Sequence, residues 1–209
     1  MFTGLLLIVA SAAPVQWTLA DAVRSSAPPA EIVGRPEVRS GSDGAYVRFD
    51  GREDGLIFPS NPLAGWAAFT ICVKMRPAVT GVPEQRFMHL ESADGHRIML
   101  ETRLAADGTW ALDSYLYAGD PHRARQLLDR KLRHPCRTWH WVTLTYADGR
   151  VTNFVDGRRE LSGTVDFPPL GPGRVGVGFR LNHLYWFSGD IQELRFYPFA
   201  LPPNRIPRL

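Results

Sequence analysis

Long apolar runs are scarce in this sequence of 209 residues. The run near the N-terminus, residues 4–13, is too short to cross a bilayer as a helix. Small residues, Ala20 and Ala22, frame an A-x-A-like cleavage site in the segment TLADAV. This pattern predicts a signal peptide over residues 1–22, and therefore a secreted or periplasmic protein whose mature form has no membrane span.

Lysine and cysteine are also rare. Lys74 and Lys131 are the only lysines, and the formal net charge is only +3, so we expect no nucleic-acid partner. The two cysteines are Cys72 and Cys136. In a cytosolic protein they would be unpaired core residues, whereas in an exported protein an even count favours one disulfide.

Familiar catalytic motifs are absent. No Glu is followed two places later by Asp, so the Glu-x-Asp-x-x-Glu strand of many sandwich-fold sugar hydrolases is missing. The Gly-x-Ser-x-Gly hydrolase motif is missing as well. A lyase that uses Tyr115 or Tyr117 with His89 or His96 stays open, although no spacing supports it. We therefore expect no catalytic residues and no enzyme activity.

Short β-prone segments separated by turn residues fill most of the chain. Asp-Gly pairs at residues 94–95, 148–149 and 156–157 indicate tight turns between strands. The predicted strand regions are residues 45–50, 69–75, 86–91, 96–102, 109–117, 140–146, 151–155, 175–181 and 185–197. Only residues 123–132 could form a helix, and they have no good cap. This pattern predicts an all-β sandwich or barrel.

The segment on the N-terminal side of this region has a different composition. Residues 23–41 are rich in Ser, Ala and Pro without periodicity, which predicts a flexible linker.

The central strand of residues 139–146 is largely apolar on both faces. Such a strand belongs inside a two-layer sandwich or beneath a covering loop.

Six segments occur in an informative order along the chain. They are residues 49–51 (FDG), 56–59 (LIFP), 69–72 (FTIC), 139–146 (WHWVTLTY), 153–157 (NFVDG) and 187–197 (FSGDIQELRFY). Together they resemble the strands of laminin G-like jelly rolls in the concanavalin A-like lectin/glucanase superfamily. The resemblance implies a two-sheet antiparallel jelly-roll sandwich over residues 42–201, followed by a tail of residues 202–209.

The resemblance is closest to pentraxins. Their signature is His-x-Cys-x-Ser/Thr-Trp-x-Ser/Thr, which His134, Cys136, Thr138 and Trp139 match in order, with Trp141 departing from it at the last place. The pentraxin disulfide joins a Phe-Thr-x-Cys strand to this element. The resemblance therefore implies a disulfide between Cys72 and Cys136.

Calcium is the cofactor that this resemblance suggests as a candidate. Pentraxins carry acidic and amide side chains before the closing strand, but residues 179–187 contain no carboxylate and offer only Asn182. Because calcium needs six to eight oxygen ligands, the double calcium site looks absent and we expect no cofactor. A single calcium ion held by Asp94 and backbone oxygens remains an alternative to Asp94 as a simple turn residue.

Aromatic side chains near predicted loops are the remaining candidates for a binding site. With one amide, the predicted ligand-binding residues are Trp110, Tyr115, Tyr117, Asn182, Tyr185 and Trp186. Aromatic faces stack on sugar rings while nearby polar groups bind the hydroxyls, although the same residues could pack in the core. The sequence therefore predicts a non-catalytic carbohydrate-binding domain, whose partner is a glycan. The alternatives are a protein-interaction or assembly module that contacts another exported protein or forms an oligomer, and an unrecognised carbohydrate-active enzyme.

Overall fold

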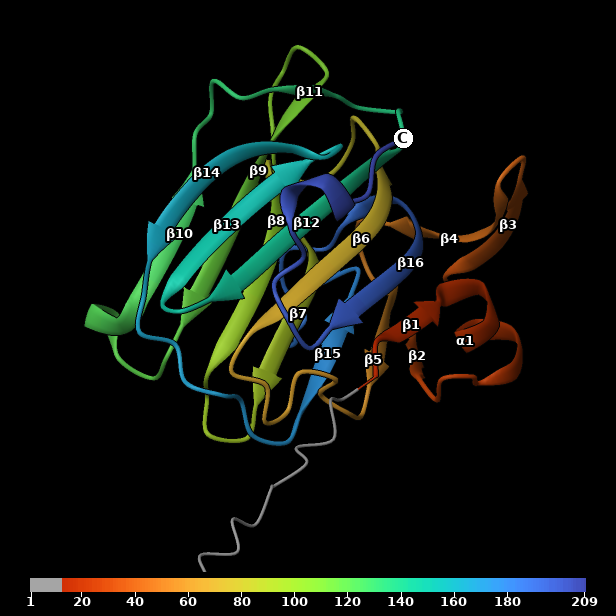
Figure 1. Cartoon of the computed structure of the whole chain (residues 1–209). Coiled ribbons are helices and arrows are strands. Elements are labelled where there is room, and N and C mark those ends of the chain that lie inside the picture. Colours follow the sequence, from red (N-terminus) through yellow and green to blue (C-terminus); the bar gives the residue numbers. More distant parts are fainter. Residues whose placement is uncertain (1–12) are drawn as a thin grey trace, which may run out of the picture.

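The protein is a sandwich of two antiparallel β-sheets, each with eight strands (Figure 1). The structure is a computed structural model, and it describes residues 13–209. The two layers confirm the all-β jelly-roll architecture that the sequence predicted. None of the described helices is long and apolar enough to cross a membrane.

Sheet A has the strand order β14-β13-β12-β6-β16-β4-β3, and β1 also pairs with β16. Its strands are β1 (Val15–Thr18), β3 (Glu37–Gly41), β4 (Gly44–Asp50), β6 (Phe69–Pro77), β12 (His140–Ala147), β13 (Arg150–Val155), β14 (Arg158–Thr164) and β16 (Ser188–Tyr197). The helical segments are α1 (Leu19–Ser25) and the 3₁₀ turns η1 (Pro121–Arg123) and η2 (Pro203–Arg205).

Sheet B has the strand order β10-β9-β8-β7-β15-β5-β2, and β11 also pairs with β9. Its strands are β2 (Glu31–Val33), β5 (Gly55–Phe58), β7 (Glu84–Ser92), β8 (Arg97–Leu104), β9 (Thr109–Tyr117), β10 (Ala124–Leu128), β11 (His134–Pro135) and β15 (Gly173–Val177). Most of the strand regions predicted from the sequence are therefore found, within a few residues at their ends.

Asp-Gly turns join consecutive strands where the sequence predicted them. Between β12 and β13, Asp148 and Gly149 have φ angles of 49° and 73°. Between β13 and β14, Asp156 and Gly157 have φ angles of 50° and 76°. Positive φ at both central residues is the geometry of a turn that matches the twist of the strands it joins, and Asp and Gly tolerate it better than most residues.

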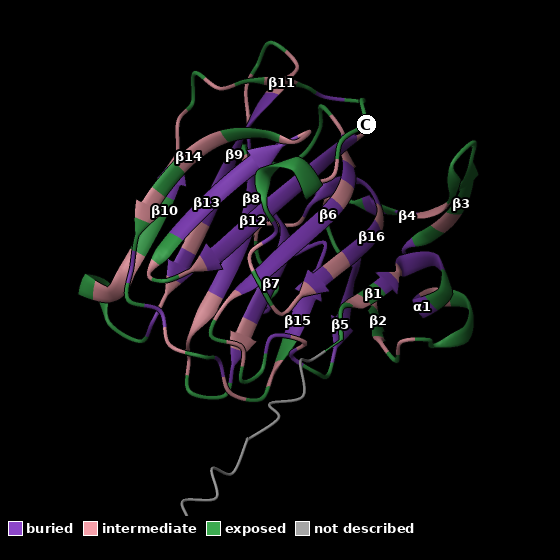
Figure 2. Cartoon of the chain, viewed as in Figure 1, coloured by how far each residue is buried: buried purple, intermediate pink, exposed green. Residues whose placement is uncertain are grey.

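The inner faces of the two sheets form one hydrophobic core, which runs through the strands coloured as buried in Figure 2. On β12, Val142 and Leu144 lie in this core, while Trp141 lies on the outer face of sheet A. Trp141 is nevertheless buried, because Leu201 and Ile206 of the C-terminal segment pack against it. The expectation for this strand is confirmed, and the predicted tail is a packed part of the fold.

The N-terminal region differs from the predicted linker. The first part of the predicted signal peptide, residues 1–12, lies outside the described residues. Next, β1 pairs with β16, and the Trp17 ring stacks on Phe58 at a centroid distance of 4.2 Å. Within residues 23–41, β2 pairs with β5 and β3 pairs with β4. The linker prediction is wrong for these strands, because backbone hydrogen bonds at a sheet edge order a polar segment without hydrophobic periodicity. The predicted cleavage site lies inside α1.

Both cysteines are buried and free, so the disulfide implied by the resemblance to pentraxins is not formed. Cys72 lies in the middle of β6, beneath the C-terminal segment. Cys136 lies beside the end of β6, because the next residue, Arg137, donates its N–H to the carbonyl of Pro77 at 2.7 Å. Five residues of extended strand, about 16 Å, separate Cys72 from Pro77. The Cα atoms of a disulfide lie only roughly 4.4–6.8 Å apart.

Two segments of sheet B also differ from expectation. Residues 123–132 do not form a helix, because Ala124–Leu128 is strand β10, paired with β9. The strand predicted for residues 175–181 ends at Val177. Gly178, with φ of 89°, turns the chain there into a loop of residues 178–187. This loop, which we call the covering loop, packs on the outer face of sheet B.

Candidate functional site

The outer face of sheet B carries polar and aromatic side chains at the positions that alternate with the core. On β9, Leu116 points into the core, whereas its neighbours Tyr115 and Tyr117 lie on the outer face, half-buried. Pairing across four strands then aligns four side chains. We call them the outer row: Arg174 on β15, Glu91 on β7, Arg97 on β8 and Tyr117 on β9. The row spans three interstrand steps, about 14 Å.

Two stacked tyrosine rings lie at one end of this row. The Tyr115 and Tyr117 ring centroids are 6.4 Å apart, and the ring planes differ by only 14°. The guanidinium carbon of Arg97 lies 4.3 Å from the centre of the Tyr117 ring. Gln126 of β10 lies opposite Tyr115 in register. The tyrosine rings therefore lie next to hydrogen-bonding side chains, of which Gln126 donates its Nε2 to Asp113 at 2.7 Å.

The charged members of the outer row keep free hydrogen-bonding capacity. Glu91, Arg97 and Arg174 are neighbours in register, but the described chain contains no ion pair for any of them. The Nε atom of Arg97 is buried without a hydrogen-bond partner. At the end opposite the tyrosines, Glu91 and Arg174 line a cavity of about 610 Å³ together with Ile57 of β5. The row therefore runs from the two tyrosines to a hollow lined by both polar and apolar groups.

The covering loop forms a wall along one side of the outer row. The N–H of Leu181 donates to Nδ1 of His89 at 3.0 Å, and the Tyr185 ring covers Arg86, whose guanidinium carbon is 3.7 Å from the ring centre. Burial, together with nearby arginines such as Arg180, lowers the pKa of His89 to about 3. His89 is therefore a neutral imidazole whose proton is on Nε2.

An ionic cluster lies beneath this wall, next to the outer row. Glu101 and Asp113 face each other on β8 and β9, and Arg103 contacts both carboxylates and Glu84. Glu101 is 1% exposed and Asp113 is fully buried. Burial raises the pKa of Glu101 to about 7, in spite of the opposing effect of Arg86 and Arg103. The side chains of the cluster are buried, and its carboxylates are not accessible to a ligand.

The structure brings most of the predicted ligand-binding residues to one side of the molecule. Tyr115, Tyr117, Tyr185 and Trp186 all lie on the outer side of sheet B, and Asn182 is exposed in the covering loop. Trp186 stacks on Phe179 at a centroid distance of 4.7 Å, so part of its ring is used in packing.

Trp110 does not join them. Its side chain is fully buried in the core, next to the His134 and His140 rings at centroid distances of 5.0 and 5.4 Å. The reason is its position on β9: Trp110 alternates with Ala111, so it shares the core face with Leu112.

Asp94 lies in the turn between β7 and β8. Its carboxylate accepts a hydrogen bond from the Ser92 hydroxyl and lies 3.3 Å from Nδ1 of His96. Within residues 13–209 no group of three or more His, Cys, Asp or Glu side chains could share a metal ion. The arrangement at Asp94 is that of a turn residue.

Sequence reasoning missed the charged part of the outer row. Glu91, Arg97 and Arg174 carry no motif, and they become neighbours only when β7, β8 and β15 pair. The alternation of β8, whose sequence is RIMLETRL, nevertheless contained a signal. It places Arg97, Met99 and Glu101 together on the face opposite Ile98 and Leu100.

A laminin G model of the concanavalin A-like lectin/glucanases superfamily matches residues 50–207. The chain belongs to this superfamily. None of the curated proteins matches the sequence. Among solved structures, this chain is similar to domain 4 of AbnA, an extracellular arabinanase of family GH43 from Geobacillus stearothermophilus. That structure was determined in complex with arabinotriose. The TM-score is 0.67 at 20% identity, covering 91% of this chain and 94% of that one.

Two further structures extend the comparison. The heptameric SAP-like pentraxin from Limulus polyphemus gives a TM-score of 0.61 at 15% identity, covering 77% of this chain and 79% of that one. The binding domain of botulinum neurotoxin serotype D gives 0.61 at 16% identity, covering 86% of this chain and 45% of that one. At these identities the likeness establishes the shared fold of the superfamily and no more.

Proposed function

We propose that this protein is an exported, non-catalytic carbohydrate-binding domain whose ligand lies along the outer row. The observation that carries the proposal is the pair of nearly parallel, half-buried tyrosine rings, Tyr115 and Tyr117, beside charged groups that form no ion pair within residues 13–209. Sugar rings stack on aromatic faces, and their hydroxyls both donate and accept hydrogen bonds. Arg97 supplies donors and Glu91 supplies acceptors within the same row.

The solved structure most informative for this proposal is the arabinanase domain that was determined with arabinotriose. That ligand belongs to the arabinanase domain, and it supports a sugar as the class of ligand for a chain with the same fold. The arabinanase is described as extracellular, which agrees with the proposed export of this chain. The fold supports binding as well as catalysis, so the proposal depends on the site itself.

The ionic cluster is the feature that would favour an enzyme, because Glu101 and Asp113 are two facing carboxylates. A general acid must come within hydrogen-bond reach of the glycosidic oxygen. Both side chains are buried: Glu101 contacts Arg86, which Tyr185 covers, and Arg103 lies against both carboxylates. We therefore assign the cluster to the stability of the sheet rather than to catalysis.

The test is binding of the purified chain to a panel of immobilised neutral polysaccharides, with calcium and with a chelator. We expect at least one polysaccharide to be retained under both conditions, because the outer row needs no metal. Substitution Tyr117→Ala should then weaken the affinity for the retained oligosaccharide by about tenfold, since the stacking surface is lost.

A matched control removes an aromatic ring from the other side of the molecule. Phe199 is 42% exposed in the C-terminal segment, away from sheet B, and Phe199→Ala should leave the affinity unchanged. The proposal fails if no polysaccharide is retained, or if Tyr117→Ala binds as tightly as the unaltered chain. Silence of the whole panel would favour the protein-interaction module instead.

A further inference from the structure

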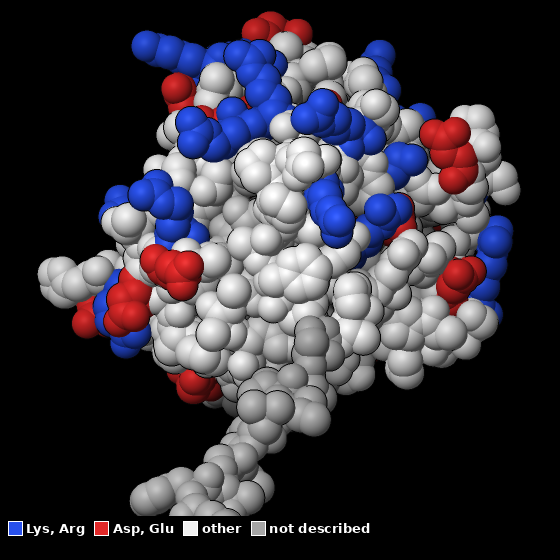
Figure 3. Space-filling model, viewed as in Figure 1, with Lys and Arg blue, Asp and Glu red and all other residues white. Residues whose placement is uncertain are grey.

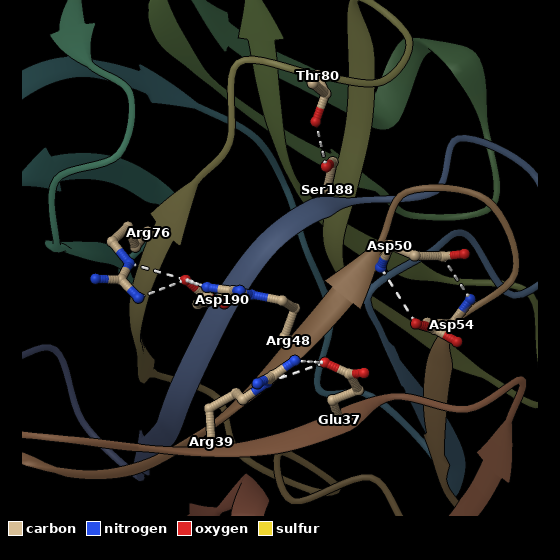
Figure 4. A network of polar contacts seen from close by, with 9 residues as sticks. All are labelled: Glu37, Arg39, Arg48, Asp50, Asp54, Arg76, Thr80, Ser188 and Asp190. Atoms are coloured by element: carbon tan, nitrogen blue, oxygen red, sulfur yellow. Dashed lines mark hydrogen bonds and ion pairs between the residues drawn. The ribbon is translucent and has the colours of Figure 1, made fainter.

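A cavity of about 710 Å³ is on the other sheet. It lies where β4 ends and β16 begins, at one end of the outer face of sheet A (Figure 4). Four arginines contribute to its lining: Arg35, Arg48, Arg76 and Arg137. No part of the outer row lines this cavity, so it is separate from the proposed sugar-binding face.

Two of these arginines are fixed in place before any ligand arrives. The side chain of Asp190 is 6% exposed. Its carboxylate accepts hydrogen bonds from Nε of Arg48 at 2.8 Å and from Nη2 of Arg76 at 2.7 Å. The guanidinium carbon of Arg76 also lies 5.1 Å from the Tyr46 ring centre and 4.8 Å from the Trp139 ring centre. One carboxylate therefore orients two cations, and Nη1 of each arginine remains without a bond to Asp190 (Figure 4).

The other carboxylates of the lining are largely occupied. Asp50 accepts three backbone N–H groups from the loop that follows it, and Asp54 accepts the N–H groups of Arg35 and Asp50. Glu37 is paired with the neighbouring Arg39 (Figure 4). Glu53 is the lining carboxylate without such a partner, and it is exposed.

The remaining arginines have the opposite character. The side chains of Arg35 and Arg137 form no ion pair within residues 13–209, and both are exposed at the cavity. Arg137 holds a positive φ of 62°, a conformation uncommon for residues other than glycine, and its N–H is tied to Pro77 of the lining. The free hydrogen-bonding groups of the cavity are therefore mainly guanidinium donors.

The lining as a whole carries both signs, with four arginines and five carboxylates. Figure 3 shows the outer face of sheet A, where Lys and Arg gather across its upper part with few acidic side chains between them.

We propose that this cavity binds the oxyanion group, a carboxylate or a sulfate, of an acidic sugar. Guanidinium groups bind such oxyanions through charge-assisted hydrogen bonds with planar geometry. The hydroxyls of Thr80 and Ser188, 2.8 Å apart at the edge of the cavity, can bind sugar hydroxyls, and the half-exposed Trp139 ring stands beside Arg76. The inference goes beyond the proposed function, which concerns neutral sugar on sheet B.

The experiment is calorimetric titration of the full chain with four ligands. These are an oligosaccharide of uronic acid, a sulfated oligosaccharide, an uncharged oligosaccharide of the same length, and inorganic sulfate. Both acidic oligosaccharides should bind to the cavity, and Arg137→Gln should weaken each by about tenfold or more, because one charge-assisted contact is lost. Arg35→Gln should act in the same direction. Neither substitution breaks an ion pair, and both keep the backbone N–H contacts.

The control must change the overall charge equally. Arg130→Gln removes an exposed arginine in the loop between β10 and β11, and it should leave the affinity for acidic ligands unchanged. The inference is overturned if Arg130→Gln and Arg137→Gln weaken binding equally, or if the uncharged ligand binds to the cavity as tightly as the acidic ones. Inorganic sulfate binding as tightly as the sulfated sugar would overturn the assignment to a sugar.

The same titrations separate this inference from the proposed function. Tyr117→Ala should leave the affinity of the cavity for acidic ligands unchanged, and Arg137→Gln should leave the retention of neutral polysaccharide unchanged. If Tyr117→Ala instead removes the binding of acidic ligands, those ligands occupy the outer row and the cavity on sheet A is not their site.

Discussion

At the scale of single residues, alternation along strand β9 decides which aromatic side chains a ligand can reach. Tyr115 and Tyr117 share one face, whereas Trp110 lies on the other face with Leu112 and Leu116. The sequence predicted all three as ligand-binding residues, because they are aromatic and lie near predicted loops. Counting in steps of two from Tyr117 reaches Tyr115 but passes over Trp110, so the alternation of a strand is enough to separate Trp110 from the others.

The pairing of the cysteines could not be obtained in this way. A sequence resemblance placed Cys72 and Cys136 on the elements that a disulfide joins in pentraxins. The structure puts Cys72 in the middle of a nine-residue strand and Cys136 beyond the end of that strand. A likeness in motifs fixes which elements are neighbours, but not the position along them at which two side chains meet.

Thiol titration without reductant tests this difference. The unfolded chain should show two reactive thiols, because neither cysteine is in a bridge. In the native state the thiols should react slowly at pH 8, since burial raises the pKa of Cys72 to about 11 and also raises that of Cys136. Finding no titratable thiol in the unfolded chain would establish a disulfide and contradict the structure.

At the scale of elements, the hairpins were predictable and the sheet edges were not. Asp-Gly pairs demand positive φ, so the turns between β12, β13 and β14 follow directly from residue types. The edge strands β2 and β3 are short and mostly exposed, so they have no sustained apolar alternation to detect. The two ends of the covering loop, residues 178–181 and 185–187, were expected to be strand, because Gly178 alone marks the point where β15 stops.

The N-terminal element gives the sharpest prediction at this scale. A chain that begins at Val23, the product of cleavage after Ala22, would lose β1 and most of α1. It should be less stable by several kcal/mol, because removing the buried Trp17 side chain alone costs roughly 3–5 kcal/mol. The measurement is the free energy of unfolding in urea, compared with that of the full chain.

The matched control is a chain that begins at Val15 and so keeps β1. It should unfold at the same urea concentration as the full chain. If the chain beginning at Val23 proved as stable as the full chain, β1 and α1 would not contribute to the stability of the fold. That result would favour the cleavage position predicted at Ala20 and Ala22.

At the scale of the whole molecule, the two sheets present different chemistry on their outer faces. Sheet B carries tyrosines beside the charged side chains of the outer row, next to the covering loop. Sheet A carries arginines fixed by Asp190 at a cavity of about 710 Å³. The sequence resemblance was sufficient for the fold, because it depends on the order of many strands. It could not locate either face, since both are assembled from residues distant in sequence.

The central claim is that a neutral glycan lies along the outer row, and the most direct measurement is mapping of amide chemical shifts. The labelled chain would be titrated with a neutral oligosaccharide taken from the retained polysaccharide. The account predicts the largest shift changes at Arg97, Tyr115 and Tyr117 and at neighbouring residues of β7, with sheet A unchanged. Changes confined to sheet A, or absent from β8 and β9, would contradict it.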